Sequence, residues 1–290
     1  MKIDRVAVAP DLLGESPVWD PESGSLFWVD IAGCKVRRLH LASGEEKTWS
    51  TPSMVGSIGL APSDRLVMGL QDGFYLLQLA TGAIEPIARL DRPDPRMRLN
   101  DGKTDRTGRF ICGGMGLHGD PLGALHRLTA PGKLETLAEG IRISNAICFS
   151  PAGDRLYFAD SLARKIMVYD YARNGIDVGA PRLFIDTEPL GSAPDGATVD
   201  CEDHVWVALV QAGKIARISP QGDAVAVLDV PVEFPTCPAF GGENMDVLFV
   251  TSIRDSGGRL ASSHPNAGGL LAIGGLGVRG VPDVRFDLAS

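Results

Sequence analysis

The chain has 290 residues, with 44% hydrophobic and 22% charged side chains, and 36 Asp and Glu against 28 Lys and Arg. The net charge of −8, with no lysine- or arginine-rich block, disfavours nucleic acid or an anionic membrane as the main partner. No run approaches the ~18 apolar residues of a membrane span, and charged residues interrupt the first ten positions, which argues against a secretory signal. Five widely spaced cysteines form neither a disulfide framework nor a CxxC pair, so we expect a cytoplasmic protein.

In chain order, the predicted elements are short strands that repeat. A polar turn followed by a short apolar run, rich in β-branched residues, occurs six times, with no convincing helical periodicity between the copies. The runs are LFWVDI, LVMGLQ, FICGGM, LYFADS, VWVALV and VLFVTS, anchored on Leu26, Leu66, Phe110, Leu156, Val205 and Leu248. A further strand follows each anchor, for example KVRRLHL from Lys35 and KIMVYDY from Lys165.

The spacing of these anchors predicts the fold. Successive anchors lie 40 to 49 residues apart, which is the period of a propeller blade. Four short antiparallel strands per repeat, six times over, predict an all-β, six-bladed β-propeller in which residues 1–290 form a single domain. A β-sandwich would lack this self-similarity, and a two-domain α/β chain would need helices. Because a closed ring leaves only short, protected sheet edges, we expect a monomer.

The repeat also predicts a site. The first strand of each blade lines the central channel, and counting back ten or eleven residues from each anchor gives its first positions. Four of the six positions carry a carboxylate or a carboxamide: Glu15, Asn100, Asn145 and Asp195. Each residue alone is as easily explained by turn chemistry, but four at one repeat phase converge on one axis. Carboxylates crowded at a channel mouth would repel each other unless a cation or protons lay between them.

The chemistry of these side chains suggests a cation. Glu, Asn and Asp supply only oxygen ligands, which suit Ca²⁺, Mg²⁺ or Mn²⁺. We therefore expect a divalent cation held by Glu15, Asn145 and Asp195, with Asn100 beside it or directed toward a substrate.

Five segments carry a family resemblance. They are LGESPVW from Leu13, RLNDGK from Arg98, ISNAICFSP from Ile143, PDGATVD from Pro194 and FGG from Phe240. In this order they resemble the SMP-30/gluconolactonase/LRE (regucalcin-like) family of six-bladed propellers, from about Leu13 to about Gly280. The family is known mainly for hydrolysis of aldonolactones, with Ca²⁺, Zn²⁺, Mn²⁺, Mg²⁺ or Fe²⁺.

The resemblance implies roles for individual residues. It places a divalent metal on Glu15, Asn145 and Asp195, and substrate contacts on Arg98 and Asn100. Two departures affect the pocket. Asn145 is followed by Ala146 where the family often has glycine, and the chain has Gly114-Met-Gly-Leu-His118 where regucalcin-like members carry acidic residues. The second departure bears on the substrate.

These residues together predict a lactonase. The metal would polarise the carbonyl of a sugar lactone, Asp195 would act as general base, and the product would be the aldonic acid. Arg98 and Asn100 would bind the sugar hydroxyls, and we include His118 as a further substrate contact. Two alternatives stay open: a metal-dependent esterase or phosphotriesterase, and a non-enzymatic calcium-binding scaffold. A scaffold would not require Arg98 and Asn100.

Overall fold

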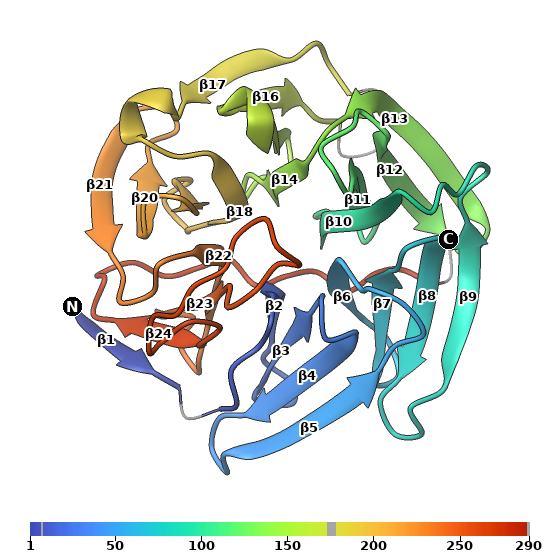
Figure 1. Ribbon diagram of the computed structural model, residues 1–290, viewed down its shortest axis with the longest axis horizontal. Helices are drawn as coiled ribbons and strands as arrows, with labels where there is room; N and C mark the ends of the chain where they lie inside the picture. The colour runs from blue at the N-terminus through green and yellow to red at the C-terminus, as the bar shows by residue number, and fades with distance from the viewer. Residues whose placement is uncertain (7, 173–177, 289–290) are drawn as a thin grey trace.

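The computed structural model describes residues 1–6, 8–172 and 178–288. Its strands form six four-stranded antiparallel sheets, arranged as blades around a central channel (Figure 1). This arrangement confirms the predicted six-bladed β-propeller. The described residues contain only two short 3₁₀ turns, η1 (Ser161–Ala163) and η2 (Glu188–Leu190), and no helix of a length and hydropathy that could cross a membrane.

The blades are numbered in chain order and given from the inner strand outward. Blades 1 and 2 are β2 (Gly14–Asp20), β3 (Ser25–Asp30), β4 (Lys35–His40), β5 (Glu45–Ser50), and β6 (Ser57–Ala61), β7 (Arg65–Gly69), β8 (Gly73–Gln78), β9 (Ile84–Arg89). Blades 3 and 4 are β10 (Met97–Thr104), β11 (Phe110–Gly116), β12 (Gly123–Ala130), β13 (Lys133–Ile141), and β14 (Ser144–Phe149), β15 (Arg155–Asp160), β16 (Lys165–Asp170), β17 (Arg182–Asp186). Blades 5 and 6 are β18 (Pro194–Val199), β19 (Val205–Leu209), β20 (Lys214–Ile218), β21 (Ala224–Asp229), and β22 (Pro235–Gly241), β23 (Val247–Ser252), β24 (Leu271–Gly274), β1 (Lys2–Arg5).

Burial falls from the channel toward the rim. Every residue of the inner strands β2, β14, β18 and β22 is buried, because these strands line the narrow channel and pack against the neighbouring blades. The outer strands β5 and β21 are mostly exposed. The six anchor residues all lie on the second strand of a blade and have no exposed surface. The repeat spacing therefore marks the packing between blades.

Five of the six inner strands carry an irregularity next to the predicted site. In these five blades the pairing register between the first and second strands shifts by a residue or more, which is the signature of a β-bulge. The shifts fall between Glu15 and Val18, Leu99 and Gly102, Asn145 and Cys148, Pro194 and Ala197, and Pro235 and Pro238. A bulge bends the strand and re-aims a side chain, so it explains how the site residues turn toward the channel.

The ring is closed by the first strand of the chain. β1 pairs antiparallel with β24 and forms the outer edge of blade 6, as Figure 1 shows where the blue and red ends meet. Arg5 lies opposite Leu271 and Lys2 lies opposite Gly274. The repeat pattern did not predict this strand, because β1 is short and carries three charged residues.

A C-terminal segment, residues 279–288, crosses the middle of the ring behind the inner strands in Figure 1. The backbone N–H of Phe286 donates to Leu60 O at 2.7 Å, and the N–H of Asp287 donates to Gly108 O at 2.8 Å. Phe286 is fully buried among core residues of blades 2 and 3. Asp283 lies 3.7 Å from the Lys103 ammonium inside the channel. Further contacts of Arg279 with Cys201, of Gly280 with Met245 and of Arg285 with Asp20 extend the strap to blades 5, 6 and 1.

One buried histidine makes stability depend on pH. His126 on β12 packs edge-on against Phe74, and burial lowers its pKa to about 4. Between pH 6.5 and 4 the unfolded chain binds a proton at His126 that the folded chain does not, so acid lowers the free energy of unfolding. From pH 7.5 to 4.5 we expect this group alone to cost about 2.5 kcal/mol.

The measurement is urea unfolding of the wild type and His126→Gln at both pH values. Other groups titrate in the same range, so the difference between the two proteins is the quantity of interest. The wild type should lose about 2.5 kcal/mol more than the variant. Equal losses would contradict the assignment.

Candidate active site

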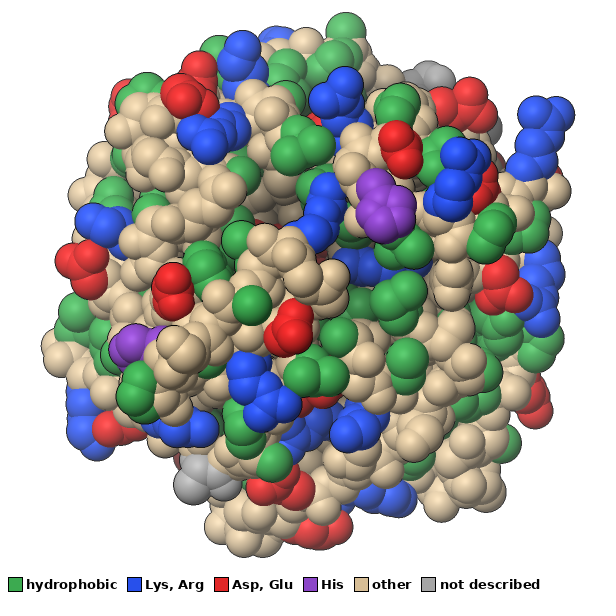
Figure 2. Space-filling view, viewed as in Figure 1, with side chains coloured by type: hydrophobic (Ala, Val, Ile, Leu, Met, Phe, Trp, Pro, Cys, Tyr) green, Lys and Arg blue, Asp and Glu red, His purple; other side chains and the backbone are tan. Residues whose placement is uncertain are grey.

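A cavity of about 320 Å³ lies at one mouth of the channel. Figure 2 shows this hollow near the centre of the face, with blue Lys and Arg side chains beside it. The volume falls in the range of small-molecule sites. The wall combines apolar side chains such as Leu13, Met54 and Ile253 with a smaller set of polar ones. The polar lining residues include Glu15, Arg98, Asn100, Asn145, Ser161, Asp195, Gln211 and Arg259.

The three predicted metal ligands meet in this cavity. Glu15, Asn145 and Asp195 come from the inner strands of blades 1, 4 and 5, and at most 8% of each residue is exposed. Asn145 Nδ2 donates to Ser161 Oγ at 2.8 Å, and Ser161 Oγ in turn donates to Pro194 O at 2.7 Å. This chain fixes the amide, so that its oxygen is directed away from Ser161.

The two carboxyl groups are crowded. Glu15 and Asp195 share a hydrogen bond, and burial followed by the neighbouring acidic charges raises both pKa values, that of Asp195 to about 8 and that of Glu15 well above its usual range. The nearby Arg98 charge opposes both shifts. Two buried carboxyl groups in contact keep a proton between them unless a cation is supplied.

The backbone beside two of these ligands is in the left-handed region. Ser16 has φ 48° and Ala146 has φ 55°, each directly after a ligand and inside the bulge. A side chain with a Cβ costs roughly 1–2 kcal/mol in this region. Ala146, where the family often has glycine, therefore adds local strain directly after the ligand Asn145.

The two predicted substrate residues lie beside the ligands. Arg98 Nη1 donates to Asn100 Oδ1 and to Leu99 O. Asn100 Nδ2 donates to Ser144 O at 2.8 Å and to Asn145 Oδ1 at 3.2 Å. Burial lowers the pKa of Arg98 to about 10, so the guanidinium keeps its charge at neutral pH.

The donor set fits a hard divalent cation. Two carboxyl groups and the Asn145 amide oxygen converge, and all are oxygen donors of the kind that Ca²⁺, Mg²⁺ and Mn²⁺ prefer. Within the described residues, no group of three or more His, Cys, Asp and Glu side chains could hold a metal. A site here therefore depends on the amide oxygen of Asn145 as its third ligand.

The edges of the cavity differ from the prediction. His118 lies exposed between β11 and β12 and is not among the lining residues, whereas its neighbour Leu117 is. Ser161, Gln211 and Arg259 line the cavity although the repeat arithmetic did not indicate them. They lie outside the inner strands, in connections where the repeat spacing carries no signal.

Comparisons with known proteins identify the family of this chain. The sequence profile of the SMP-30/Gluconolactonase/LRE-like region matches residues 13–254, so the chain belongs to this family. It is 34% identical over 294 residues to regucalcin from Gallus gallus, covering 99% of this chain and 98% of the relative. It is also 36% identical over 266 residues to the L-arabinolactonase of Azospirillum brasilense, covering 89% and 87%.

Other relatives include a second lactonase and a solved structure. The 6-deoxy-6-sulfogluconolactonase of Pseudomonas putida is 31% identical over 249 residues, covering 85% of each chain. The crystal structure of a calcium-binding protein, regucalcin, from Agrobacterium tumefaciens superimposes with a TM-score of 0.92 at 32% identity. That match covers 98% of this chain and 97% of the other.

Proposed function

We propose that the protein hydrolyses a sugar lactone to the corresponding aldonic acid, using a divalent cation held by Glu15, Asn145 and Asp195. The observation that carries the proposal is the convergence of these three oxygen ligands beside Arg98 and Asn100 in one small cavity. Two relatives that are named for lactone hydrolysis, the 6-deoxy-6-sulfogluconolactonase and the L-arabinolactonase, support the same reaction. Ca²⁺ is the favoured cation, because all three ligands are oxygens and one relative is described as calcium-binding.

The chemistry divides between the cation and the chain. When bound, a divalent cation supplies a Lewis acid for the lactone carbonyl oxygen. Asp195 accepts a proton from the attacking water at a carboxylate oxygen. The bond between the carbonyl carbon and the ring oxygen then breaks, and the proton passes to that oxygen, which becomes a hydroxyl group. Water is consumed and a carboxylic acid is formed.

Arg98 and Asn100 bind and orient the substrate. The contact of Arg98 with Asn100 Oδ1 holds the guanidinium against the cavity wall. Both side chains offer hydrogen bonds to a polyhydroxylated ring, which suits a sugar better than an apolar aryl ester. The apolar wall at Leu13 and Ile253 can cover the less polar face of the ring.

The test starts from metal-depleted protein. Single divalent cations are returned, and acid release is followed with a pH indicator on a panel of aldono-1,4- and 1,5-lactones. We expect cation-dependent hydrolysis that a chelator abolishes. Cation binding with no turnover on any lactone would refute the lactonase and favour a calcium-binding scaffold, whereas turnover on aryl esters or phosphotriesters alone would favour the other enzyme class.

Replacing Arg98 should separate substrate binding from cation binding. We expect Arg98→Ala to lower kcat/KM by about 100-fold, because a buried charged hydrogen-bond donor is lost. Cation affinity should stay equal or increase, since a positive charge close to Glu15 and Asp195 is removed. Steady-state kinetics and calorimetric Ca²⁺ titration measure the two effects.

Arg96→Ala is the matched control for this variant. Arg96 lies two residues earlier, is exposed and pairs with Asp94 outside the cavity. It should leave both quantities within about twofold. A loss of cation affinity in Arg98→Ala as large as the loss of kcat/KM would show that Arg98 acts mainly on the cation site.

A further inference from the structure

One arginine crosses the mouth of the cavity. Arg259 belongs to the connection between β23 and β24 of blade 6 and lines the cavity. A Cβ added to Gly119 would lie 3.0 Å from Arg259 Nη2 and 3.5 Å from Leu162 Cδ1. Gly119 belongs to blade 3, which faces blade 6 across the ring, and Leu162 belongs to blade 4. The guanidinium therefore reaches over the site from the opposite side, and Figure 1 shows the red connection extending to the ring centre.

The loop that carries Arg259 is built to project it. Asp255 and Ala261 form an isolated antiparallel bridge, and Ser256 Oγ accepts the backbone N–H of Leu260 at 2.9 Å. Asp255 Oδ1 accepts the backbone N–H groups of Gly257 at 2.9 Å and Gly258 at 3.2 Å. Both glycines have positive φ, 83° and 94°, which a residue with a side chain rarely adopts. These hydrogen bonds hold a tight turn directly before Arg259.

Arg259 has no protein partner for its charge. Among residues 1–6, 8–172 and 178–288, no carboxylate forms an ion pair with it and no acceptor takes its hydrogen bonds. Arg164 at the same face, by contrast, pairs with Glu188 at 2.9 Å. A guanidinium presents a planar fork of donors that suits two oxygens of one anionic group. The structure leaves this fork open to the cavity.

The charges of the cavity favour an anion. Its wall holds two carboxyl groups, Glu15 and Asp195, and two guanidinium groups, Arg98 and Arg259. With a divalent cation on the carboxylates, as the proposed function requires, two positive charges remain. The buried Asp101 carboxyl, behind the wall, acts on Glu15 and Asp195 and offsets part of this charge, but a neutral sugar would add nothing to balance the rest. An anionic substrate would balance part of this excess.

We propose that the substrate is an anionic sugar lactone, with a carboxylate, sulfonate or phosphate group remote from the lactone carbonyl, and that Arg259 binds this group. The proposal rests on the proposed lactonase function and adds the substrate class. Arg259 is a specificity residue here, because it contacts the remote group and takes no part in bond breaking. A lactone held by the cation site at its carbonyl end would point its far end toward the mouth that Arg259 spans.

The test compares paired substrates. A neutral aldonolactone and the aldarolactone of the same ring differ only in a terminal CH₂OH or carboxylate. We expect the wild type to prefer the aldarolactone, and Arg259→Ala to lower its kcat/KM about 10- to 100-fold, mainly through KM. Hydrolysis of the neutral lactone should change less than twofold, and Arg259→Lys should recover part of the loss. Lactones with a terminal sulfonate or phosphate then show which anion fits best.

Arg254→Ala is the matched control, since Arg254 is exposed in the same connection but does not line the cavity. It should leave both substrates unchanged. Equal losses on the neutral and anionic lactones in Arg259→Ala, or no loss on either, would overturn the proposal.

A failure of the lactonase itself can be told apart from a failure of this proposal. If no lactone is hydrolysed, calorimetry with the open-chain diacid and monoacid still tests the anion site on the cation-loaded protein. Tighter binding of the diacid that disappears in Arg259→Ala supports the site. Equal binding of the two acids, or an effect unchanged in the variant, refutes it.

Discussion

Replacing Asp195 by asparagine is expected to lower kcat/KM for lactone hydrolysis by about 1000-fold and to weaken Ca²⁺ binding. The amide keeps the shape of the side chain but removes the proton acceptor and one negative ligand charge, and a general base alone contributes roughly 10²- to 10⁴-fold. Indicator assays give the rate, and calorimetry on metal-depleted protein gives the affinity. A variant that keeps more than a tenth of the activity would exclude Asp195 as the base.

The substitution should not unfold the protein, because it removes the repulsion between two crowded carboxyl groups. Glu15 and Asp195 are both buried and in contact, so removing one ionisable group should leave the metal-free protein at least as stable. Asp283→Asn is the control. Asp283 also lies on the channel, beside Lys103, but outside the cavity, so its replacement should leave kcat/KM within about twofold.

Replacing Asp200 by alanine should give the largest loss of stability. Its fully buried carboxylate accepts from Trp206 Nε1 at 2.9 Å and from Arg217 Nε at 2.8 Å, and it also caps the turn before β19. Alanine would leave the Trp206 indole N–H and the Nε–H of Arg217 without an acceptor, and only the exposed Glu202 would still form an ion pair with this guanidinium. Breaking such a buried pair costs about 3–5 kcal/mol. Guanidinium unfolding measures the change.

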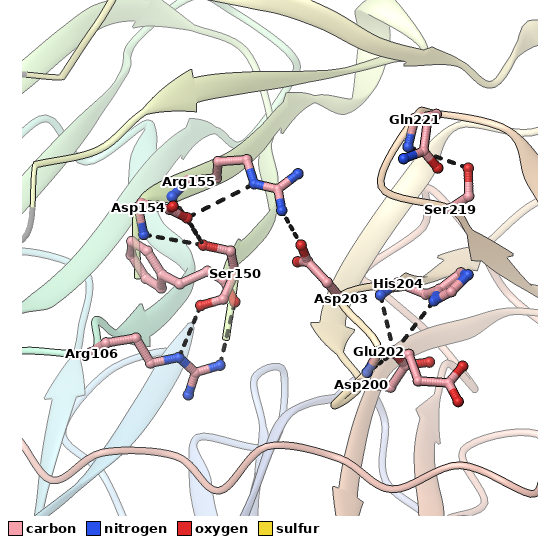
Figure 3. Close-up of polar contacts among 11 residues, drawn as sticks. Arg106, Ser150, Asp154, Arg155, Asp200, Glu202, Asp203, His204, Ser219 and Gln221 are labelled. Carbon is pink, nitrogen blue, oxygen red and sulfur yellow. Dashed lines mark hydrogen bonds and ion pairs between the residues drawn. The ribbon is translucent and has the colours of Figure 1, made fainter. Parts of the chain in front are cut away.

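Glu202→Ala provides a matched comparison on the same arginine. Glu202 also pairs with Arg217, at 2.6 Å, but its side chain is 56% exposed, and Figure 3 shows it on the same turn as Asp200 and His204. An exposed ion pair contributes at most about 1 kcal/mol. Equal losses in the two variants would contradict the argument that burial makes the Asp200 pair important.

The same trio recurs in another blade. Asp11 accepts from Trp28 Nε1 at 2.8 Å and from Arg37 Nη1 at 2.6 Å. In both blades the tryptophan lies on the second strand and the arginine on the third. Figure 3 also shows Arg155 of blade 4 facing Asp203 of blade 5, an ion pair that joins neighbouring blades. Buried polar groups thus contribute to packing within and between the sheets.

The inner architecture was predictable because it repeats. The anchors on the second strands face the same packing environment in every blade, so the same kind of residue recurs at a constant distance from the channel mouth. Glu15, Asn145 and Asp195 share a repeat phase, and the structure brings them into one cavity. Their bulges were not predicted, since a bulge leaves no periodic signal.

Segments that do not repeat from blade to blade could not be predicted from the spacing of the repeats. Arg259 lies in the connection between β23 and β24, outside the repeating strands, and its partner surface at Gly119 is far away in sequence. His118 belongs to a connection that borders the cavity only through Leu117. The strap through Phe286 depends on contacts with five blades. Such placements follow from tertiary packing and not from local pattern.

The pairing of β1 with β24 has a consequence for synthesis on the ribosome. β1 is made before the five complete blades and β24 after them, so at roughly 5–20 residues per second β1 waits on the order of tens of seconds for its partner. An unpaired strand is a site for wrong association during that time. Lys2, Asp4 and Arg5 are charged and remain exposed even after pairing. These three charges interrupt the apolar pattern by which a strand is recognised in the sequence. They also disfavour pairing of the unprotected strand with another chain until the ring closes.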